Sequence, residues 1–250
     1  MNINNIRIVL VNTTHPGNIG AVARAMKTMG LANLTLVNPK LFPHPEADAM
    51  SSRAEDILQQ AKVVATLHEA INDCCLVVGV SARLRSLEMQ RFDPKQIALP
   101  ILQATQQTNV ALVFGREATG LTNEELDLCH QLLHIPSEAT FSSLNLAQAV
   151  QIVCYELRMA SLAANNASLN NAAENNAMDQ EYATIEEAEG FFQHLEKTLW
   201  DIAFIRPSNP KEVMRKLRRL YGRTRLKKEE INILRGILTA TKNYGERSER

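Results

Sequence analysis

Three short polar segments of this chain carry residue types that bind anions or position reacting oxygen atoms, and each follows an apolar run. The first, Thr13–Arg24, contains glycines, an asparagine and an arginine directly after Ile6–Val11. The second, Phe114–Leu121, holds an arginine and a glutamate between two glycines, and the third, Ile135–Leu146, is rich in hydroxyls. A glycine-containing turn into a helix exposes N–H groups that could hold an anion.

Each segment also has a purely structural explanation, and the residues alone leave both open. The first can be a tight turn into a helix, with Arg24 on its solvated side. Arg116 and Glu117 are costly to bury unpaired, so each needs a partner, and a local ion pair between them is one solution. Ser142 or Ser143 can cap a following helix. Because the chain has no Walker lysine and no G-x-G-x-x-G pattern here, a nucleotide site does not follow from these segments alone.

The histidines and cysteines could be drawn as a metal cluster, but their spacing argues against one. Leu132–Ile135 is typical of a strand, in which His130 and His134 point to the same face about 13 Å apart. We therefore expect no metal at Cys129, His130 and His134. Without a C-x-x-C pair, we expect buried thiols outside disulfides at Cys74, Cys75, Cys129 and Cys154.

The polar segments need a scaffold that brings them together, and the first 164 residues have the pattern of a parallel α/β sheet. Short apolar runs alternate with helical sequence, at 6–11, 34–37, 76–79, 110–114 and 132–135. Such runs are typical of parallel strands covered on both faces. Ligands of these sheets bind in loops beyond the carboxyl ends of the strands, where all three polar segments lie.

The remaining pattern predicts helices and a domain boundary. Helices are expected at Asn18–Gly30 and from Ser143 to about Ala163, and a capping box at Thr122–Glu125 predicts another helix start. Asn165–Met178 is almost entirely Asn, Ala and Ser, which is typical of a flexible linker. We expect an α/β domain over 1–164, a linker over 165–183 and a small all-helical domain over 184–250, with helices near 184–203, 210–222 and 228–243.

Charge is unevenly divided between these parts, although the chain has 27 acidic and 27 basic residues. Arg206–Lys228 holds ten basic residues against a single acidic one, Glu212, and is therefore a candidate polyanion-binding surface. On a helical wheel, an apolar face of Val213, Leu217 and Leu220 lies opposite a basic cluster. The basic cluster consists of Lys211, Arg215, Arg218 and Arg219. The alternative is a solvated basic face without a ligand.

No segment indicates a membrane or export. No apolar run approaches the roughly 20 residues that a membrane span needs. Met1–Arg7 lacks the basic stretch and apolar core of a signal peptide. We therefore expect a cytoplasmic protein.

Taken together, the three segments resemble the motifs of the SPOUT superfamily of RNA methyltransferases. The matching stretches are Asn18-x-Gly20-Ala-x-x-Arg24, Leu112-Val-Phe-Gly-Arg-Glu-x-x-Gly-Leu121 and Ser142-Ser-Leu-Asn-Leu-Ala147. The chain is similar to the bacterial TrmJ type, the tRNA (cytidine/uridine-2′-O)-methyltransferases. This resemblance continues beyond the linker, through Phe191–Glu196, Lys216–Leu220 and Asn232–Leu238.

The resemblance implies a fold, a cofactor and a substrate. The fold would be α/β with a C-terminal trefoil knot, assembled as a homodimer through the knotted region. S-adenosyl-L-methionine (SAM) would methylate the ribose of cytidine or uridine at nucleotide 32 of the tRNA anticodon loop. The implied cofactor contacts lie in loops after three strands, at Val80, Ser81, Ala82, Gly115, Ile135, Ser142, Ser143 and Leu144.

The resemblance also makes Arg24 the expected catalytic residue, with Ser143 and Asn145 orienting the ribose or the polar end of the cofactor. A guanidinium stays protonated at neutral pH, which favours a clamp on the neighbouring phosphate that stabilises developing alkoxide charge. A role as proton acceptor stays open. Glu117 and Arg116 are expected to organise the loop that receives RNA. The expected RNA contacts are Arg24, Arg83, Arg85 and Arg116, together with the basic cluster.

Two other functions stay compatible with the sequence. One is a related 2′-O-methyltransferase acting on rRNA or on another tRNA position, since only the resemblance names the nucleotide. The other is a non-catalytic RNA-binding protein that kept the fold. The presence of Arg24, Gly115 and the segment Ser142–Asn145 disfavours this second alternative.

Overall fold

The structure is a computed structural model, and it describes residues 3–82, 91–138, 140–170, 181–205 and 210–248. The chain divides into two compact units, Met1–Asn176 and Ala177–Arg250. The division falls within the segment 165–183 that the composition assigns to a linker. Residues 171–180 of that segment lie outside the described residues.

The first unit is built on one parallel sheet, which comprises seven strands within the described residues. In spatial order they are β3 (Lys62–Val64), β2 (Asn33–Val37), β1 (Ile6–Val11), β6 (Asn109–Phe114), β4 (Cys74–Val80), β7 (Gln131–Leu133) and β5 (Arg91–Phe92). The central strands are almost entirely buried because both faces of the sheet are covered. The predicted parallel α/β sheet is confirmed, and the short strands β3 and β5 extend it beyond the five predicted runs.

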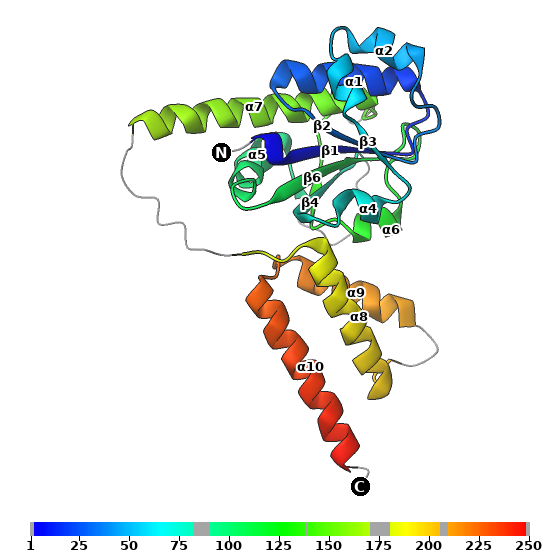
Figure 1. Cartoon of the computed structure of the whole chain (residues 1–250), viewed down its shortest axis with the longest axis vertical. Helices are drawn as coiled ribbons and strands as arrows, with labels where there is room; N and C mark the ends of the chain where they lie inside the picture. The colour runs from blue at the N-terminus through cyan, green and yellow to red at the C-terminus, as the bar shows by residue number, and fades with distance from the viewer. Residues whose placement is uncertain (1–2, 83–90, 139, 171–180, 206–209, 249–250) are drawn as a thin grey trace. The chain divides into compact units, whose positions relative to one another are not determined.

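Helices lie on both faces of the sheet. On one side are α1 (Pro16–Met29), α2 (Pro45–Ser51) and α7 (Leu146–Asn170), and on the other are α4 (Leu67–Ile71) and α6 (Asn123–Asp127) (Figure 1). Of the remaining helices, α3 (Glu55–Gln59) contacts α1, and α5 (Pro94–Ala104) contacts α7. A 3-10 turn, Ile3–Asn5, precedes β1. The trefoil knot stays a prediction.

The glycines of the first polar segment have a different role from the expected one. Helix α1 begins at Pro16, so Gly17 and Gly20 lie inside it and not in the preceding turn. A Cβ atom at Gly20 would stand 2.0 Å from the carbonyl oxygen of Ala47, so this glycine allows α2 to pack closely on α1. The predicted helix end is confirmed, because Gly30 takes a left-handed conformation with φ of 81°.

Helix α7 is shifted relative to its expected range. It begins at Leu146 and not at Ser143, and it extends through Asn170, beyond the expected start of the linker at residue 165. The extension has a simple cause, because no glycine or proline interrupts the alanine-rich sequence. The predicted apolar side of this helix is confirmed, since Leu146, Val150, Val153 and Leu157 are all buried.

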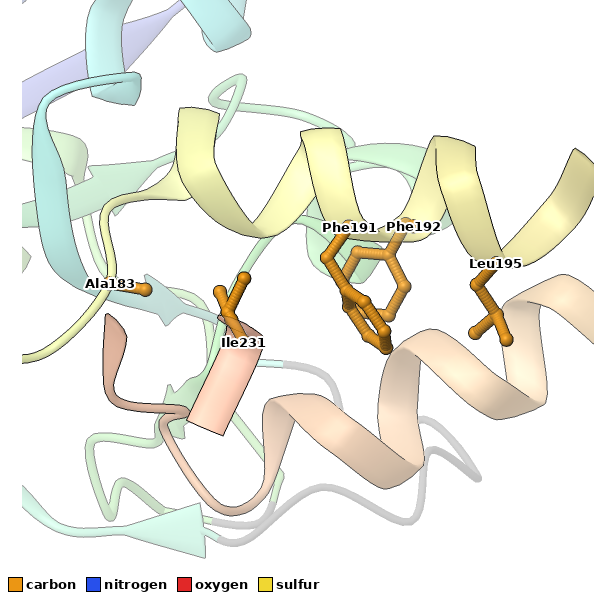
Figure 2. Packing of buried hydrophobic residues seen from close by; sticks show 5 residues of the cluster. All are labelled: Ala183, Phe191, Phe192, Leu195 and Ile231. Atoms are coloured by element: carbon orange, nitrogen blue, oxygen red, sulfur yellow. The ribbon is translucent and has the colours of Figure 1, made fainter. Parts of the chain in front are cut away.

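The second unit consists of helices, as predicted. They are α8 (Ile185–Asp201), α9 (Pro210–Gly222) and α10 (Lys228–Ser248). Thr184 and Glu187 form a capping box that starts α8. The buried cluster of this unit is drawn in Figure 2 and consists of Ala183, Phe191, Phe192, Leu195 and Ile231.

The predicted apolar face of α9 is confirmed at Leu217, which packs against the core of the second unit, and is wrong at Leu220. Leu220 is 56% exposed, whereas Met214 is buried and Tyr221 packs against the core of the second unit. Arg218 lies on the packed side, because its guanidinium makes two bonds to the Glu189 carboxylate, of 2.5 and 2.8 Å. It also stands 4.7 Å from the centre of the Phe192 ring. Arg218 therefore does not belong to a solvent-facing basic cluster.

Two further expectations concern the whole chain. No described helix is long and apolar enough to cross a membrane. The cysteines are buried, and within the described residues none forms a disulfide, as predicted. Burial raises the pKa of Cys74, Cys129 and Cys154 to about 12, so these thiols are poor nucleophiles at neutral pH.

Candidate functional site

A cavity lies at the carboxyl ends of β4, β6 and β7 and receives the three loops that follow them. The empty space in it, including the open mouth, is about 640 Å³. All eight residues predicted to contact a cofactor line it, namely Val80, Ser81, Ala82, Gly115, Ile135, Ser142, Ser143 and Leu144. The lining is completed by Phe114, Arg116, Glu117, Gly120, Leu146 and Ala149.

The loop after β6 is folded back on itself, and this explains its glycines. Arg116 and Gly120 exchange backbone hydrogen bonds, with N···O distances of 3.3 and 2.9 Å. A Cβ atom at Gly115 would lie 2.2 Å from the carbonyl carbon of Gly120. The loop itself therefore makes a close backbone approach at Gly115, and a larger residue at this position would displace the loop.

Arg116 and Glu117 have separate partners, so the local ion pair considered between them is wrong. The Arg116 guanidinium makes two bonds to the Glu125 carboxylate, of 2.9 and 3.0 Å. Glu125 also accepts from the Thr122 N–H, completing the predicted capping box at the start of α6. Arg116 thus ties the loop to α6, and its contact with RNA stays a prediction.

The Glu117 carboxylate occupies the N-terminal end of α1. It accepts from the N–H groups of Thr14 and His15 at 3.2 and 3.3 Å, from the Thr14 hydroxyl at 2.9 Å and from the Asn18 amide at 3.0 Å. The sequence predicted that free N–H groups of the helix could hold an anion, and in the structure a carboxylate of the chain itself binds the N–H groups of the two residues before α1. A carboxylate is favoured at this end of a helix by the helix dipole.

These donors decide the ionisation of Glu117. Burial alone would raise its pKa, but the hydrogen bonds from Asn18, Thr14 and His15 outweigh burial, and the net pKa lies below the ordinary 4.5. The carboxylate is therefore ionised at neutral pH, with its oxygens occupied by donors.

Asn18 and Asn145 extend this network to the third polar segment. The Asn145 amide donates to Asn18 Oδ1 at 3.0 Å, while Asn145 Oδ1 accepts from the Ala147 N–H at 2.8 Å. Asn145 thus caps α7, a role that was the structural alternative for Ser142 or Ser143. The chain Glu117–Asn18–Asn145 joins all three polar segments. The polar run Thr13–His15 indicates hydrogen-bond donors in the sequence, but their acceptor, Glu117, follows about a hundred residues later in the chain.

Arg24 stands apart from the cavity. It is exposed on α1, its nearest described polar contact is the Ser52 hydroxyl at 3.4 Å, and it is not among the described residues that line the cavity. The expected RNA contacts Arg83 and Arg85 lie outside the described residues, as does the side chain of Lys211. Arg215 and Arg219 of the basic cluster are half-buried.

The two histidines considered as metal ligands bind the backbone of β4 and its end. His130 Nδ1 accepts from the Val77 N–H at 3.0 Å, and His134 Nδ1 lies 3.1 Å from the Ser81 carbonyl oxygen. Within the described ranges, no three His, Cys, Asp or Glu side chains are grouped as metal ligands would be.

The sheet, the cavity at its carboxyl edge and the linked polar segments define a methyltransferase of the SpoU class. The model of the SpoU rRNA methylase family matches residues 5–155, and the chain belongs to this family. The model of the C-terminal domain of tRNA methyltransferase TrmJ matches residues 186–250. Together with the full-length relatives below, this second match shows that the chain belongs to the TrmJ family.

The relatives span nearly the whole chain. The tRNA (cytidine/uridine/adenosine-2′-O-)-methyltransferase TrmJ of Pseudomonas aeruginosa is 51% identical, over 96% of this chain and 94% of its own length. The tRNA (cytidine/uridine-2′-O-)-methyltransferase TrmJ of Klebsiella pneumoniae is 50% identical, over 95% and 96%. Among solved structures, TrmJ from Z. mobilis ZM4 is 33% identical with a TM-score of 0.78, over 94% of this chain and 97% of that one.

Glu117→Gln should destabilise the first unit, because the amide nitrogen of Gln cannot accept hydrogen bonds from the donors at the start of α1. We expect a loss of about 2 kcal/mol at neutral pH. Since folding lowers the pKa of Glu117, its contribution is present above pH 4.5 and is lost as the pH falls below that value. The difference between wild type and variant should therefore shrink in acid, as measured by denaturant unfolding over a pH series.

The matched control is Glu124→Gln, which removes a charge from an exposed glutamate on the neighbouring helix α6. It should change the stability far less at every pH. Equal stabilities of wild type and Glu117→Gln at neutral pH would contradict the role of this carboxylate.

Proposed function

We propose that the chain transfers a methyl group from SAM to the ribose 2′-oxygen of cytidine or uridine at nucleotide 32 of tRNA, in the cytoplasm. The observation that carries this proposal is the cavity, which gathers residues from three separated motifs at one edge of the sheet. Relatives with about half of their residues identical bear the names of tRNA 2′-O-methyltransferases. The nucleotide position rests on the resemblance alone.

The residues present fit SAM as the cofactor. Val80, Phe114, Ile135 and Leu144 offer an apolar lining, while the hydroxyls of the Ser142–Ser143 pair and nearby backbone groups offer polar partners. When bound, SAM supplies a methyl group that its sulfonium charge makes electrophilic. The chain itself must then hold the ribose and lower the cost of charge on its 2′-oxygen.

The side chains divide these tasks. Arg24 clamps a phosphate next to the reacting ribose and stabilises negative charge on the 2′-oxygen. Ser143 lines the cavity and orients the ribose or the cofactor, and Asn145 positions this segment through Asn18 and the α7 cap. Glu117 is a poor proton acceptor, because its pKa is lowered and its oxygens already accept hydrogen bonds.

We further propose that Arg24 serves the cavity of a second copy in a homodimer. In its own chain Arg24 lies on the exposed side of α1, outside the cavity lining. Helix α7, which packs on α1, exposes Tyr155, Met159 and Leu162 at helical spacing. These side chains form an apolar stripe suited to a self-association surface.

Two alternatives keep the same chemistry or the same fold. A solved chain whose subject is the methylation of C/U34 on tRNA is 25% identical with a TM-score of 0.50, which makes a tRNA position other than nucleotide 32 one alternative. A non-catalytic RNA-binding protein would retain RNA affinity without binding SAM. SAM affinity, measured by calorimetry, separates this alternative from both methyltransferases.

A deletion strain tests the substrate and the position together. Loss of the gene should remove one 2′-O-methyl group from nucleotide 32 of a subset of tRNAs, and mass-spectrometric mapping of tRNA and rRNA fragments detects this loss. Restoring the wild-type gene should restore the modification. Loss of a methyl group from rRNA, or from another tRNA position, would overturn the proposed position.

Arg24→Ala should abolish most turnover while leaving SAM affinity nearly unchanged, because Arg24 acts on the RNA and not on the cofactor. Arg24→Lys keeps the positive charge but loses the bidentate geometry of the guanidinium, and its turnover rate should lie between those of the wild type and Arg24→Ala. Single-turnover rates of Arg24→Ala within about threefold of wild type would refute this role.

Mixed dimers test which cavity Arg24 serves. Ser143→Trp fills the cavity from an exposed position, so this variant should not bind SAM. Dimers of one Arg24→Ala chain and one Ser143→Trp chain retain one complete site if the arginine acts across the dimer, and activity should return on mixing. Mixtures that stay inactive would place Arg24 at its own cavity.

The second unit should grip tRNA through basic side chains other than Arg218. Reversing Lys211, Arg215 and Arg219 to Glu should weaken tRNA binding. It should also flatten the slope of log K against log salt by roughly 0.7 to 0.9 for each phosphate that the variant no longer neutralises. SAM affinity should not change.

Arg218→Met is the control, since it removes an ion pair and should lower stability while leaving the salt slope intact. An unchanged slope in the triple variant would refute RNA binding by this surface.

A further inference from the structure

Phe141 is the most exposed large apolar side chain in the described part of the chain, with 81% of its surface accessible to solvent. A phenyl ring in water forfeits the free energy that burial would supply. A ring at this position on a loop is therefore available to a partner outside the described residues.

The backbone around Phe141 is held on both sides. Its own N–H donates to the Glu138 carbonyl oxygen at 3.0 Å and closes a turn. The carbonyl of the next residue, Ser142, accepts from the Ser137 hydroxyl at 3.1 Å. These two hydrogen bonds restrain the backbone next to the ring, and such restraint lowers the entropic cost of binding a partner.

The position of this loop decides what the partner can be. Phe141 immediately precedes Ser142, Ser143 and Leu144, which line the cavity. In the proposed reaction the target ribose must reach the mouth of this cavity, and its base must lie nearby. An exposed aromatic ring next to these lining residues in the chain is a platform on which a nucleobase stacks.

We propose that the ring of Phe141 stacks on the base of the nucleotide whose ribose is methylated, a role that rests on the proposed function. Phe141 is then a positioning residue that fixes the ribose against the cavity. Because every base has a π-face, stacking holds the nucleotide without reading the edge of its base. Recognition of the base would therefore be tolerant at this contact.

Substitutions that separate the flat ring from mere apolar bulk test the proposal in the full-length chain. Phe141→Leu keeps an apolar side chain but loses the π-face, whereas Phe141→Tyr keeps both. Phe141→Leu should lower kcat/KM for tRNA about tenfold, and Phe141→Tyr should stay near wild type. SAM affinity and the sedimentation coefficient should be the same in all three proteins.

A substrate lacking the target base makes the test specific. RNA with an abasic ribose at the methylated nucleotide should be a poorer substrate for the wild type by about the same factor as the Phe141→Leu substitution causes. The Phe141→Leu protein should discriminate little between this RNA and the normal one, because the stacking is already missing.

The outcomes are distinguishable. The proposal is overturned if Phe141→Leu retains wild-type kcat/KM, or if it discriminates against the abasic RNA as strongly as the wild type. It is also overturned if the substitution dissociates an oligomer, since the ring would then contact a second copy. A wild-type protein that binds SAM yet methylates no RNA would overturn the proposed function itself, whatever Phe141 does.

Discussion

The carboxylate of Glu117 is the contact on which the arrangement of the site depends. It enters from the loop after β6, and its donors come from the turn before α1 and from the first turn of that helix. Burial of a charge is unfavourable, and here several hydrogen bonds and the helix dipole offset it. This anion adds a direct link between the N-terminus of α1 and the loop that lines the cavity, beyond the pairing of β1 with β6.

Short-range sequence signals predicted the elements well because their causes are local. The β-branched runs, the left-handed Gly30 and the capping box of Thr122 and Glu125 act within a few residues, and the structure confirms each of them. The links that assemble the site span much longer separations: 99 residues between Asn18 and Glu117 and 127 between Asn18 and Asn145. Residue types indicated that such partners were needed, but only the fold pairs them.

Helix α9 shows why a helical wheel can misplace a charged residue. A wheel treats every arginine as polar and assigns Arg218 to the solvent side. In the structure, Glu189 and Phe192 of α8 provide a carboxylate and an aromatic face for the same guanidinium. The stem and the planar head of arginine can then join a packed surface. The charge pattern of the sequence thus predicted too large a basic surface, because Arg218 of that surface joins α9 to α8.

The Glu117 contact also fixes where Arg24 lies relative to the cavity. Glu117 fixes the start of α1 at the cavity edge, and Arg24 lies eight residues further along, about 12 Å up the helix axis. A straight helix keeps its two ends at a fixed separation over that length. The arginine and the cavity are therefore held in fixed relation within each chain, with Arg24 on the exposed side of α1 and outside the described lining of the cavity. In the proposed homodimer, Arg24 of one chain and the cavity of the other are two such rigid pieces, which a symmetric pair of chains brings together with one kind of contact.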